Sequence, residues 1–238
     1  MIIEVLYPEL CCLYGDQANI KYLQKCIPDA TVHFTHNRSV PKFVTEPVDL
    51  IYLGTMTESK QEMALDRLLP YKDLLWERIE AGQFVLATGN AIELFGSHIE
   101  DNGKSIPALG YFPTYAKRDL GNRHNSMLIG QFEDLTLVGN KSQFSFSYGK
   151  CEHPFIKVTG GFGMNPLDAT EGIHYKNFFG TYLLGPFLVL NPPFTKYLLR
   201  SMGCADILAF EEEVMAAYNH RVGELSQDGV EYLMDECH

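Results

Sequence analysis

Short apolar runs alternate along the first hundred residues with segments whose apolar positions recur at helical spacing. Such runs are typical of buried strands, and their alternation with helices is typical of an α/β sheet. Asp16 is positioned to cap the first helix, which ends near Cys26. The pattern predicts strands at 1–6, 31–34, 50–53 and 84–87, and helices at 16–26, 60–69, 74–81 and 91–95.

The second half of the chain is richer in predicted strands, which are short and broken by Gly, Asn and Asp. They lie at 127–129, 135–138, 143–148, 156–159 and 178–183, and an amphipathic helix at 206–225 precedes a weakly specified tail. No repeat or long linker divides the chain. We therefore expect one domain over residues 1–238, a three-layer α/β sandwich of the flavodoxin-like type with a mostly parallel sheet and a β-rich extension.

Charge and composition exclude several classes of protein. The 238 residues carry a formal net charge of −11, which disfavours a nucleic-acid binder that depends on neutralising phosphates. Because no run of about 18 apolar residues occurs, we expect no membrane span, and we expect no secretory signal. The six cysteines then indicate reduced thiols and a cytoplasmic location. They include no Cys-x-x-Cys pair, so neither a metal site nor a cofactor is predicted.

The most informative segment is 84–96, FVLATGNAIELFG. An apolar strand runs through Thr88-Gly89-Asn90 directly into a helix, and a sharp strand-to-helix turn of this kind is where several hydrolases present a nucleophile. The helix start also offers backbone N–H groups that can stabilise negative charge. Taken alone, the segment is more typical of an ordinary strand-to-helix junction in a doubly wound sheet than of a nucleophile elbow.

Several motifs together resemble a known family. They are LYPEL at 6–10, LYGD at 13–16 with Asn19, LGT at 53–55 with Gln61, ALG at 108–110, LVG at 137–139, and the stretch 161–192 with ATEG, YKN, GTYL, GP and NP. Over about residues 3–200 the chain resembles class I glutamine amidotransferases of the cobyric acid synthase type, and among these the glutaminase subunit of lipid II isoglutaminyl synthase. The resemblance implies the class I amidotransferase fold and a synthetase partner of the Mur-ligase-like or cobyric-acid-synthase-like kind.

The chain departs from the family pattern at the positions that carry chemistry. When the family's elbow is matched on ELFG at 93–96, Gly89 stands where the resemblance places the cysteine nucleophile, and Glu93 stands where it places a glutamine. The family's catalytic histidine position is Leu184, and its Phe-Glu-Asn-His segment has become 140–143, with Gln143 at the histidine. The Gly-rich oxyanion loop has become Gly54-Thr55-Met56-Thr57.

Glycine cannot attack an amide and leucine cannot accept a proton, so the usual Cys–His mechanism has lost both of its reacting groups. Our first hypothesis is an amidotransferase-like pseudoenzyme that binds or scaffolds a partner acting on a peptidoglycan precursor. A second is an enzyme with a relocated nucleophile at Thr88, Cys11 or Cys12. A third is a sensor that binds a small molecule in the vestigial pocket, for which the candidate binding residues are Gly54, Thr55, Asn90, Glu93 and Gln143.

Overall fold

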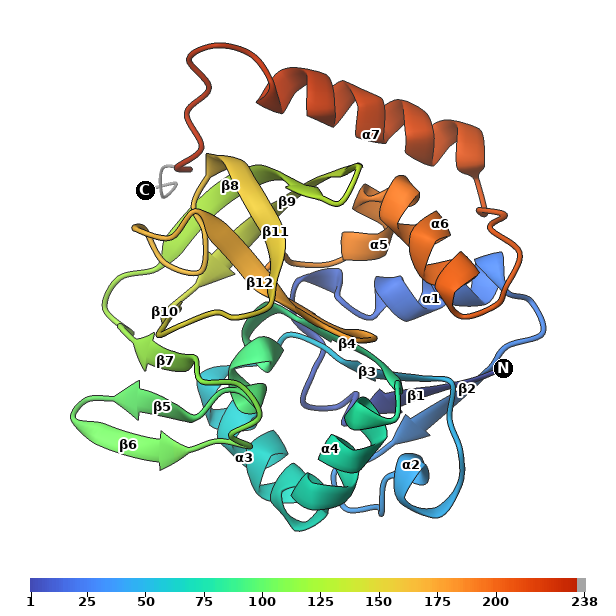
Figure 1. The fold of residues 1–238 in the computed structure, drawn as a ribbon, viewed down its shortest axis with the longest axis vertical. Helices are drawn as coiled ribbons and strands as arrows, with labels where there is room; N and C mark the ends of the chain where they lie inside the picture. Colours follow the sequence, from blue (N-terminus) through green and yellow to red (C-terminus); the bar gives the residue numbers. More distant parts are fainter. Residues whose placement is uncertain (235–238) are drawn as a thin grey trace.

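The computed structural model describes residues 1–234 and builds them around a nine-stranded sheet with helices on both faces (Figure 1). The strand order is β2-β1-β3-β4-β13-β12-β11-β8-β9. The first five strands are parallel, and the last four continue the sheet in antiparallel fashion. The bounds are β1 Ile2–Leu6, β2 Thr31–Thr35, β3 Leu50–Leu53, β4 Phe84–Thr88, β8 His124–Phe132, β9 Leu135–Gln143, β11 Pro154–Gly161, β12 Thr170–Tyr175 and β13 Phe178–Thr181. The predicted α/β sandwich is confirmed, and its β-rich extension is the antiparallel half.

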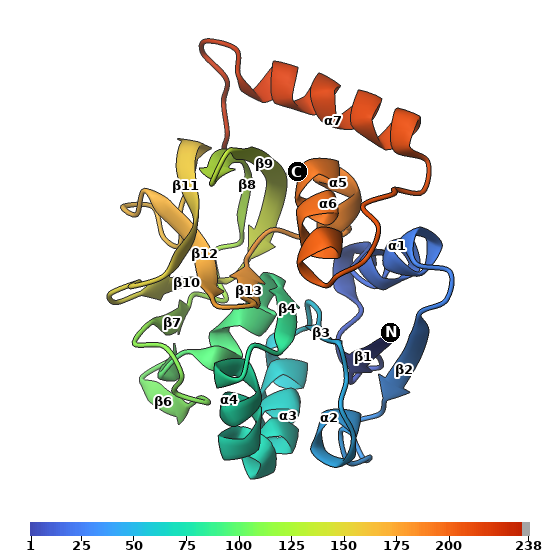
Figure 2. The same cartoon turned by 45° about the vertical axis from the view of Figure 1, so that its right-hand side comes forward.

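Two groups of helices cover the two faces of the sheet (Figures 1 and 2). One face carries α1, α5 and α6 over a core that includes Phe187 and Phe194, and the other carries α2, α3 and α4 over a core that includes Leu65 and Ile79. The last helix, α7, crosses above β8 and β9. The bounds are α1 Ala18–Cys26, α2 Lys42–Thr45, α3 Glu58–Leu68, α4 Lys72–Glu80, α5 Phe187–Leu190, α6 Pro192–Ser201 and α7 Glu211–Leu225, with 3-10 helices η1 Leu13–Gly15, η2 Leu69–Tyr71 and η3 Gly89–Phe95. None of the described helices is both long and apolar enough to cross a membrane.

A second, four-stranded sheet lies beside α3 and η3, in the order β10-β7-β5-β6. Its strands are β5 His98–Asp101, β6 Lys104–Pro107, β7 Tyr115–Arg118 and β10 Ser145–Tyr148. Only β10 falls within a predicted strand. The other three are four residues long and largely polar, so that no apolar run marks them.

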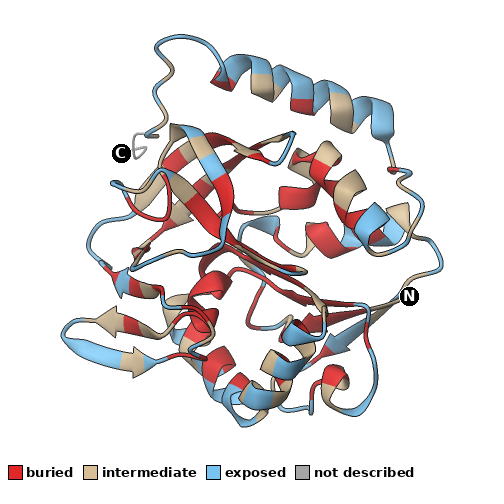
Figure 3. Ribbon diagram, in the orientation of Figure 1, coloured by how far each residue is buried: buried red, intermediate tan, exposed pale blue. Residues whose placement is uncertain are grey.

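Burial follows the layers (Figure 3). The β3 strand is buried along its whole length, and so are the last four residues of β4, because helices cover both faces of the parallel half. This is why the apolar runs at 50–53 and 84–87 were recognisable in the sequence. By contrast, β2 is an edge strand and is mostly exposed.

The starts of α1 and α7 differ from the prediction for identifiable reasons. Asp16 does not cap α1, whose N-cap is Gln17, and the Asp16 side chain instead turns into the interior. The last helix begins at Glu211 rather than 206, because Phe210 adopts a left-handed backbone conformation with φ 54°. The predicted tail is described as far as residue 234, and residues 235–238 lie outside the described part.

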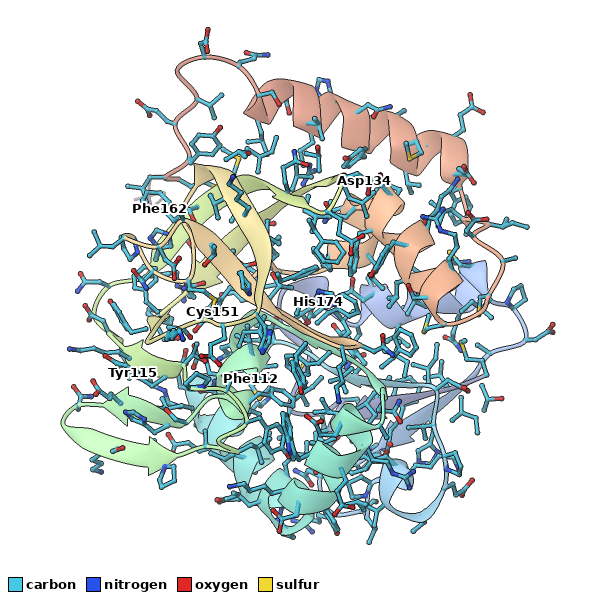
Figure 4. The ribbon with its side chains drawn as sticks, in the orientation of Figure 1. Phe112, Tyr115, Asp134, Cys151, Phe162 and His174 are labelled. Carbon is cyan, nitrogen blue, oxygen red and sulfur yellow. The ribbon has the colours of Figure 1, made fainter. Side chains whose placement is uncertain are left out.

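Lys141 on β9 is a buried cation close to the candidate site. Its Nζ donates to the carbonyls of Phe162 at 3.0 Å and Gly163 at 2.7 Å, and it lies 3.8 Å from Glu171 Oε1. Burial lowers the pKa of Lys141 from its ordinary value of 10.5 to about 8, although the Glu171 carboxylate opposes the shift. Lys141 therefore ties β9 to the loop that joins β11 to β12, where Phe162 is labelled in Figure 4.

Candidate functional site

The elbow lies at the carboxyl end of β4, where the chain turns into η3. Gly89 has φ +60°, a left-handed conformation that glycine adopts without steric cost. The carboxyl ends of the parallel strands bring this turn next to the loop that follows β3, as open α/β sheets do at their ligand sites. A cavity of about 100 Å³ opens here and is lined by both Gly89 and Leu184. The structure thus brings together the two positions that the sequence comparison singled out.

The Thr55 side chain fills the space that a side chain at position 89 would need. A Cβ built on Gly89 would lie 2.8 Å from Thr55 Cβ and 2.7 Å from Thr55 Cγ2, and Thr55 Oγ1 is closer still. Such contacts are shorter than the 3.5–4.0 Å optimum for carbon atoms. The elbow therefore keeps a left-handed backbone conformation but has no room for a cysteine.

Asp16 holds Thr55 in this position. Asp16 Oδ2 accepts hydrogen bonds from Thr55 N at 2.5 Å, Thr55 Oγ1 at 3.0 Å and Thr88 Oγ1 at 2.7 Å. Burial raises the pKa of Asp16, and these hydrogen bonds oppose the rise. Gly54 permits the approach, since a Cβ there would lie 2.6 Å from Asp16 Oδ2. Asp16 therefore fixes Thr55 and Thr88 in place next to the turn at Gly89.

The backbone donors of the loop after β3 are already engaged. Thr55 N is bonded to Asp16, and Met56 N donates to Asn90 Oδ1 at 3.1 Å. Asn90 Nδ2 returns a bond to the Met56 carbonyl at 2.8 Å. An oxyanion hole needs donors aimed at empty space where charge develops. The N–H groups of Thr55 and Met56 are instead bonded to the side chains of Asp16 and Asn90. The Asn90 side chain therefore closes the loop rather than binding a ligand.

The cavity offers neither a thiol nor an imidazole. Its walls within residues 1–234 contain hydroxyl, amide and apolar side chains with one carboxylate and one guanidinium. They are Leu13, Tyr14, Thr55, Met56, Thr57, Glu58, Gly89, Asn90, Arg123, Ser142, Gln143, Phe144, Ser145, Tyr182 and Leu184. Leu184 is buried, and its backbone N–H donates to the Asn140 carbonyl at 2.9 Å, which fixes the loop after β13 against β9.

Glu93 lies behind the wall of the cavity rather than in it. Its carboxylate accepts hydrogen bonds from Ser145 Oγ, from Tyr182 OH at 2.9 Å and from Gln61 Nε2 at 2.8 Å. Burial raises the pKa of Glu93, whereas these donors and the charge of Arg118 lower it. The side chain thus has a set of protein partners that hold β10 and the loop after β13 to η3.

Arg118 completes this buried network. Its guanidinium donates to Gln61 Oε1 at 2.8 Å, to Glu62 at 2.7 Å and to Asp101 at 2.9 Å. The network joins the small sheet to α3 and, through Gln61, to Glu93. Glu93 is therefore placed as a structural carboxylate.

Gln143 is the candidate binding residue whose side chain remains incompletely bonded. Its Nε2 donates to the Ser145 carbonyl at 2.5 Å, whereas its Oε1 is buried and has no partner among residues 1–234. Gln143 also lines the cavity. Because a buried acceptor without a donor is costly, this oxygen is suited to accept a hydrogen bond from a molecule in the cavity.

The alternative nucleophiles are poorly placed for attack. Thr88 is buried and bonded to Asp16, and Cys11 is buried with its thiol 3.9 Å from Met56 Sδ. Burial raises the pKa of the Cys11 thiol and so disfavours the thiolate. Cys12 is exposed, but it does not line the cavity.

Two other polar clusters are separate from the site. His174 on β12 stacks on Phe179 with ring centroids 4.6 Å apart, and burial lowers its pKa (Figure 4). Among the described residues, no group of three or more His, Cys, Asp or Glu side chains is arranged to hold a metal ion, including the segment 151–153. The five cysteines of the described part are free thiols.

Comparison with curated proteins decides the family. The chain is 30% identical over 193 residues to the subunit GatD of lipid II isoglutaminyl synthase (glutamine-hydrolyzing) from Staphylococcus aureus, covering 79% of this chain and 78% of that protein. The chain belongs to the GatD family of glutamine amidotransferases. The GatD subunit from Streptococcus pneumoniae is 29% identical over 192 residues, 78% of this chain and 74% of that protein. No family model matches the chain.

Solved structures support the fold of a GatD-family protein. A crystal structure of a glutamine amidotransferase superposes with a TM-score of 0.57 at 15% identity, covering 85% of this chain and all of that one. The structure of PurLQS from Thermotoga maritima gives a TM-score of 0.54 at 10% identity over 93% of this chain and 98% of the other. At these identities the likeness establishes the class I amidotransferase fold.

Sequence reasoning missed several residues that shape this family member's site. Asp16 and Tyr182 lie inside the LYGD and GTYL motifs, but the sequence gave Asp16 only the role of a helix cap and gave Tyr182 none. Ser145 and Arg118 gave no signal. Their importance depends on Glu93, which is 52 residues from the serine in sequence.

Proposed function

We propose that this GatD-family chain is an amidotransferase-like subunit without glutaminase activity. Glutamine hydrolysis through a Cys–His pair needs a thiolate at the elbow and a base opposite it. Gly89 and Leu184 supply neither. The observation that carries the proposal is Thr55, whose side chain occupies the space of the missing nucleophile and is fastened there by Asp16. This arrangement is a filled site rather than an empty one.

The subunit role that we propose is binding or scaffolding of a Mur-ligase-like synthetase, with a cobyric-acid-synthase-like partner as the alternative. Support comes from the curated relatives, which are subunits of lipid II isoglutaminyl synthase. Amidation of a peptidoglycan precursor in the cytoplasm is the process that this partnership would serve. The rigid polar core around Glu93 and Asp16 would keep the amidotransferase surface in shape after the loss of chemistry.

A small-molecule sensor is a second candidate function, and one observation favours it. Gln143 lines the cavity, and its side-chain Oε1 is a buried acceptor without a donor among residues 1–234, which a ligand could satisfy. Thermal-shift measurements with amino acids, nucleotides and cell-wall fragments separate the two proposals. Stabilisation by one of these compounds supports the sensor, and its loss in Gln143→Leu assigns the compound to this cavity.

An enzyme with a relocated nucleophile is the remaining alternative. The burial of Thr88 and Cys11 weighs against it. An electrophilic glutamine analogue, followed by mass spectrometry of the intact chain and its peptides, tests it directly. Under our proposal no residue becomes labelled at saturating reagent, whether or not the synthetase is present. An adduct on Thr88, Cys11 or Cys12 that free glutamine prevents would refute the non-catalytic proposal.

The scaffold role has its own test. The chain is mixed with a Mur-ligase-like synthetase from the same genome, and the mass of the mixture is measured by size-exclusion chromatography with light scattering. We expect a stable complex whose formation needs no glutamine. If the two proteins elute separately at micromolar concentrations, the proposed scaffold role is wrong.

A further inference from the structure

A second cavity, of about 490 Å³, lies on another part of the molecule, between α7, the segment that follows it, and β8 and β9. Its walls come from four separate parts of the chain. They are Met127 on β8, Gly139 and Asn140 on β9, Arg221, Glu224 and Leu225 on α7, and Val230 and Met234 beyond it. Figures 1 and 2 show α7 above these strands and the following segment turning back toward β8. Its volume falls within the range of about 300–1,000 Å³ that is usual for small-molecule sites.

The floor of this cavity is apolar and held in place. Met127, Leu225 and Val230 belong to one hydrophobic cluster. The segment after α7 is fastened to β8 because Met127 N donates to the Tyr232 carbonyl at 2.7 Å, and Met234 N donates to the Asn125 carbonyl at 2.9 Å. The cavity is therefore framed by hydrogen-bonded backbone.

One cation in the wall has no acceptor within the described part of the chain. Arg221 is partly buried, and its guanidinium makes no hydrogen bond or ion pair with any residue of 1–234. The acidic group nearby, Glu224, has its Oε1 3.3 Å from His220 Nε2. Asn140 also lines the cavity, and its side-chain amide makes no hydrogen bond within the described residues. A guanidinium that has no acceptor among residues 1–234 and lies beside an apolar floor is complementary to a molecule that has an anionic head and an apolar chain.

We propose that this cavity binds a small amphipathic anion, with a carboxylate or phosphate head at Arg221 and Asn140 and an apolar chain against Met127, Leu225 and Val230. The proposal is independent of whether the elbow is catalytic. The site adjoins the elbow through β9, since the Asn140 carbonyl accepts the hydrogen bond from Leu184 N.

The test uses octanoate, octyl phosphate, octanol and octylammonium as probes, each below its micelle concentration. Binding to the full chain is measured by isothermal titration calorimetry and by chemical shifts of the Asn140, Leu225 and Val230 amides. We expect saturable binding of at least one anion, with shifts at these amides. Tighter binding of octanoate assigns a carboxylate head, and tighter binding of octyl phosphate assigns a phosphate head. Octylammonium binding as tight as that of the anions would overturn the proposal, and so would the absence of anion binding.

Variants locate the head group. Arg221→Gln should weaken anion binding about tenfold to a hundredfold, because it removes a charge-assisted hydrogen bond. Arg200→Gln on α6, where the arginine is paired with Asp206, is the matched control and should leave affinity unchanged. An Arg221→Gln affinity equal to that of the control refutes the site. A chain ending at Met234 is tested in parallel, and anion binding seen only in that shorter chain would show that residues 235–238 compete for the cavity and would overturn the proposal.

Discussion

The contact between Gly89 and Thr55 makes a sharp prediction about stability. Gly89→Ala adds one methyl group to a residue with φ +60° and directs it at the Thr55 side chain. The left-handed conformation costs a non-glycine residue about 1–2 kcal/mol. Overpacking a buried contact adds about 1–3 kcal/mol. The free energy of unfolding should therefore fall by about 2–5 kcal/mol, the sum of these two ranges.

A matched control separates the two causes. Gly103 also has a positive φ, +79°, but a Cβ there would meet nothing within 4 Å. Gly103→Ala should cost only the conformational part, about 1–2 kcal/mol. The difference between the two variants then measures the contact with Thr55.

The assay is chemical denaturation of both alanine variants, of Thr55→Gly and of the double variant Gly89→Ala/Thr55→Gly. Because Thr55→Gly removes the atoms that the new methyl group meets, the double variant should be about 1–3 kcal/mol more stable than the sum of the single effects. A Gly89→Ala variant as stable as Gly103→Ala, or a double variant that is merely additive, would show that Thr55 does not fill the elbow.

Two further predictions concern the buried charges. Lys141 is protonated in both folded and unfolded chains below pH 8, but between pH 8 and 10.5 the unfolded chain holds more protons. The free energy of unfolding of the wild type should therefore rise with pH across this window, by up to about 3 kcal/mol relative to that of Lys141→Met. Urea denaturation at each pH measures this difference. Equal pH profiles for the two proteins would contradict the assigned pKa. Arg118→Met should cost about 3–5 kcal/mol, because it leaves Gln61 and Asp101 without their donor, whereas Arg200→Met on the surface should cost at most about 1 kcal/mol. Thermal unfolding checks this pair, and similar losses for both arginines would contradict the buried network.

The parallel half of the fold was predictable from the sequence because its strands are buried on both faces. The runs at 50–53 and 84–87 contain only apolar residues, and the structure places them as β3 and β4. The small sheet was not predictable in the same way. Its strands β5 to β7 are short and mostly polar, and most of their residues are exposed or only partly buried, so their pairing depends on contacts that local sequence does not encode.

The motifs predicted where the candidate site lies, but they did not predict that the space at the elbow is filled. Gly89 and Leu184 were identified by their positions in motifs, and both line one cavity. Thr55 fills the space beside Gly89 through a contact between residues 34 positions apart, which local sequence does not reveal. Thr55 Oγ1 also lies 3.5 Å from the Thr88 carbonyl. Asp16 shows the same limit. Its place before a helix predicted a cap, whereas in the structure its buried carboxylate fixes Thr55 and Thr88 through hydrogen bonds.

Glutamine hydrolysis tests the central claim most directly. The purified chain is incubated with glutamine labelled with ¹⁵N in its side-chain amide, alone and with a Mur-ligase-like synthetase, and ammonium release is followed by NMR. The account predicts no release above that of buffer, and none from Cys11→Ala or Cys12→Ala. Ammonium release that follows the chain through purification would contradict it, and its loss in Cys11→Ala or Cys12→Ala would assign the release to a relocated thiol.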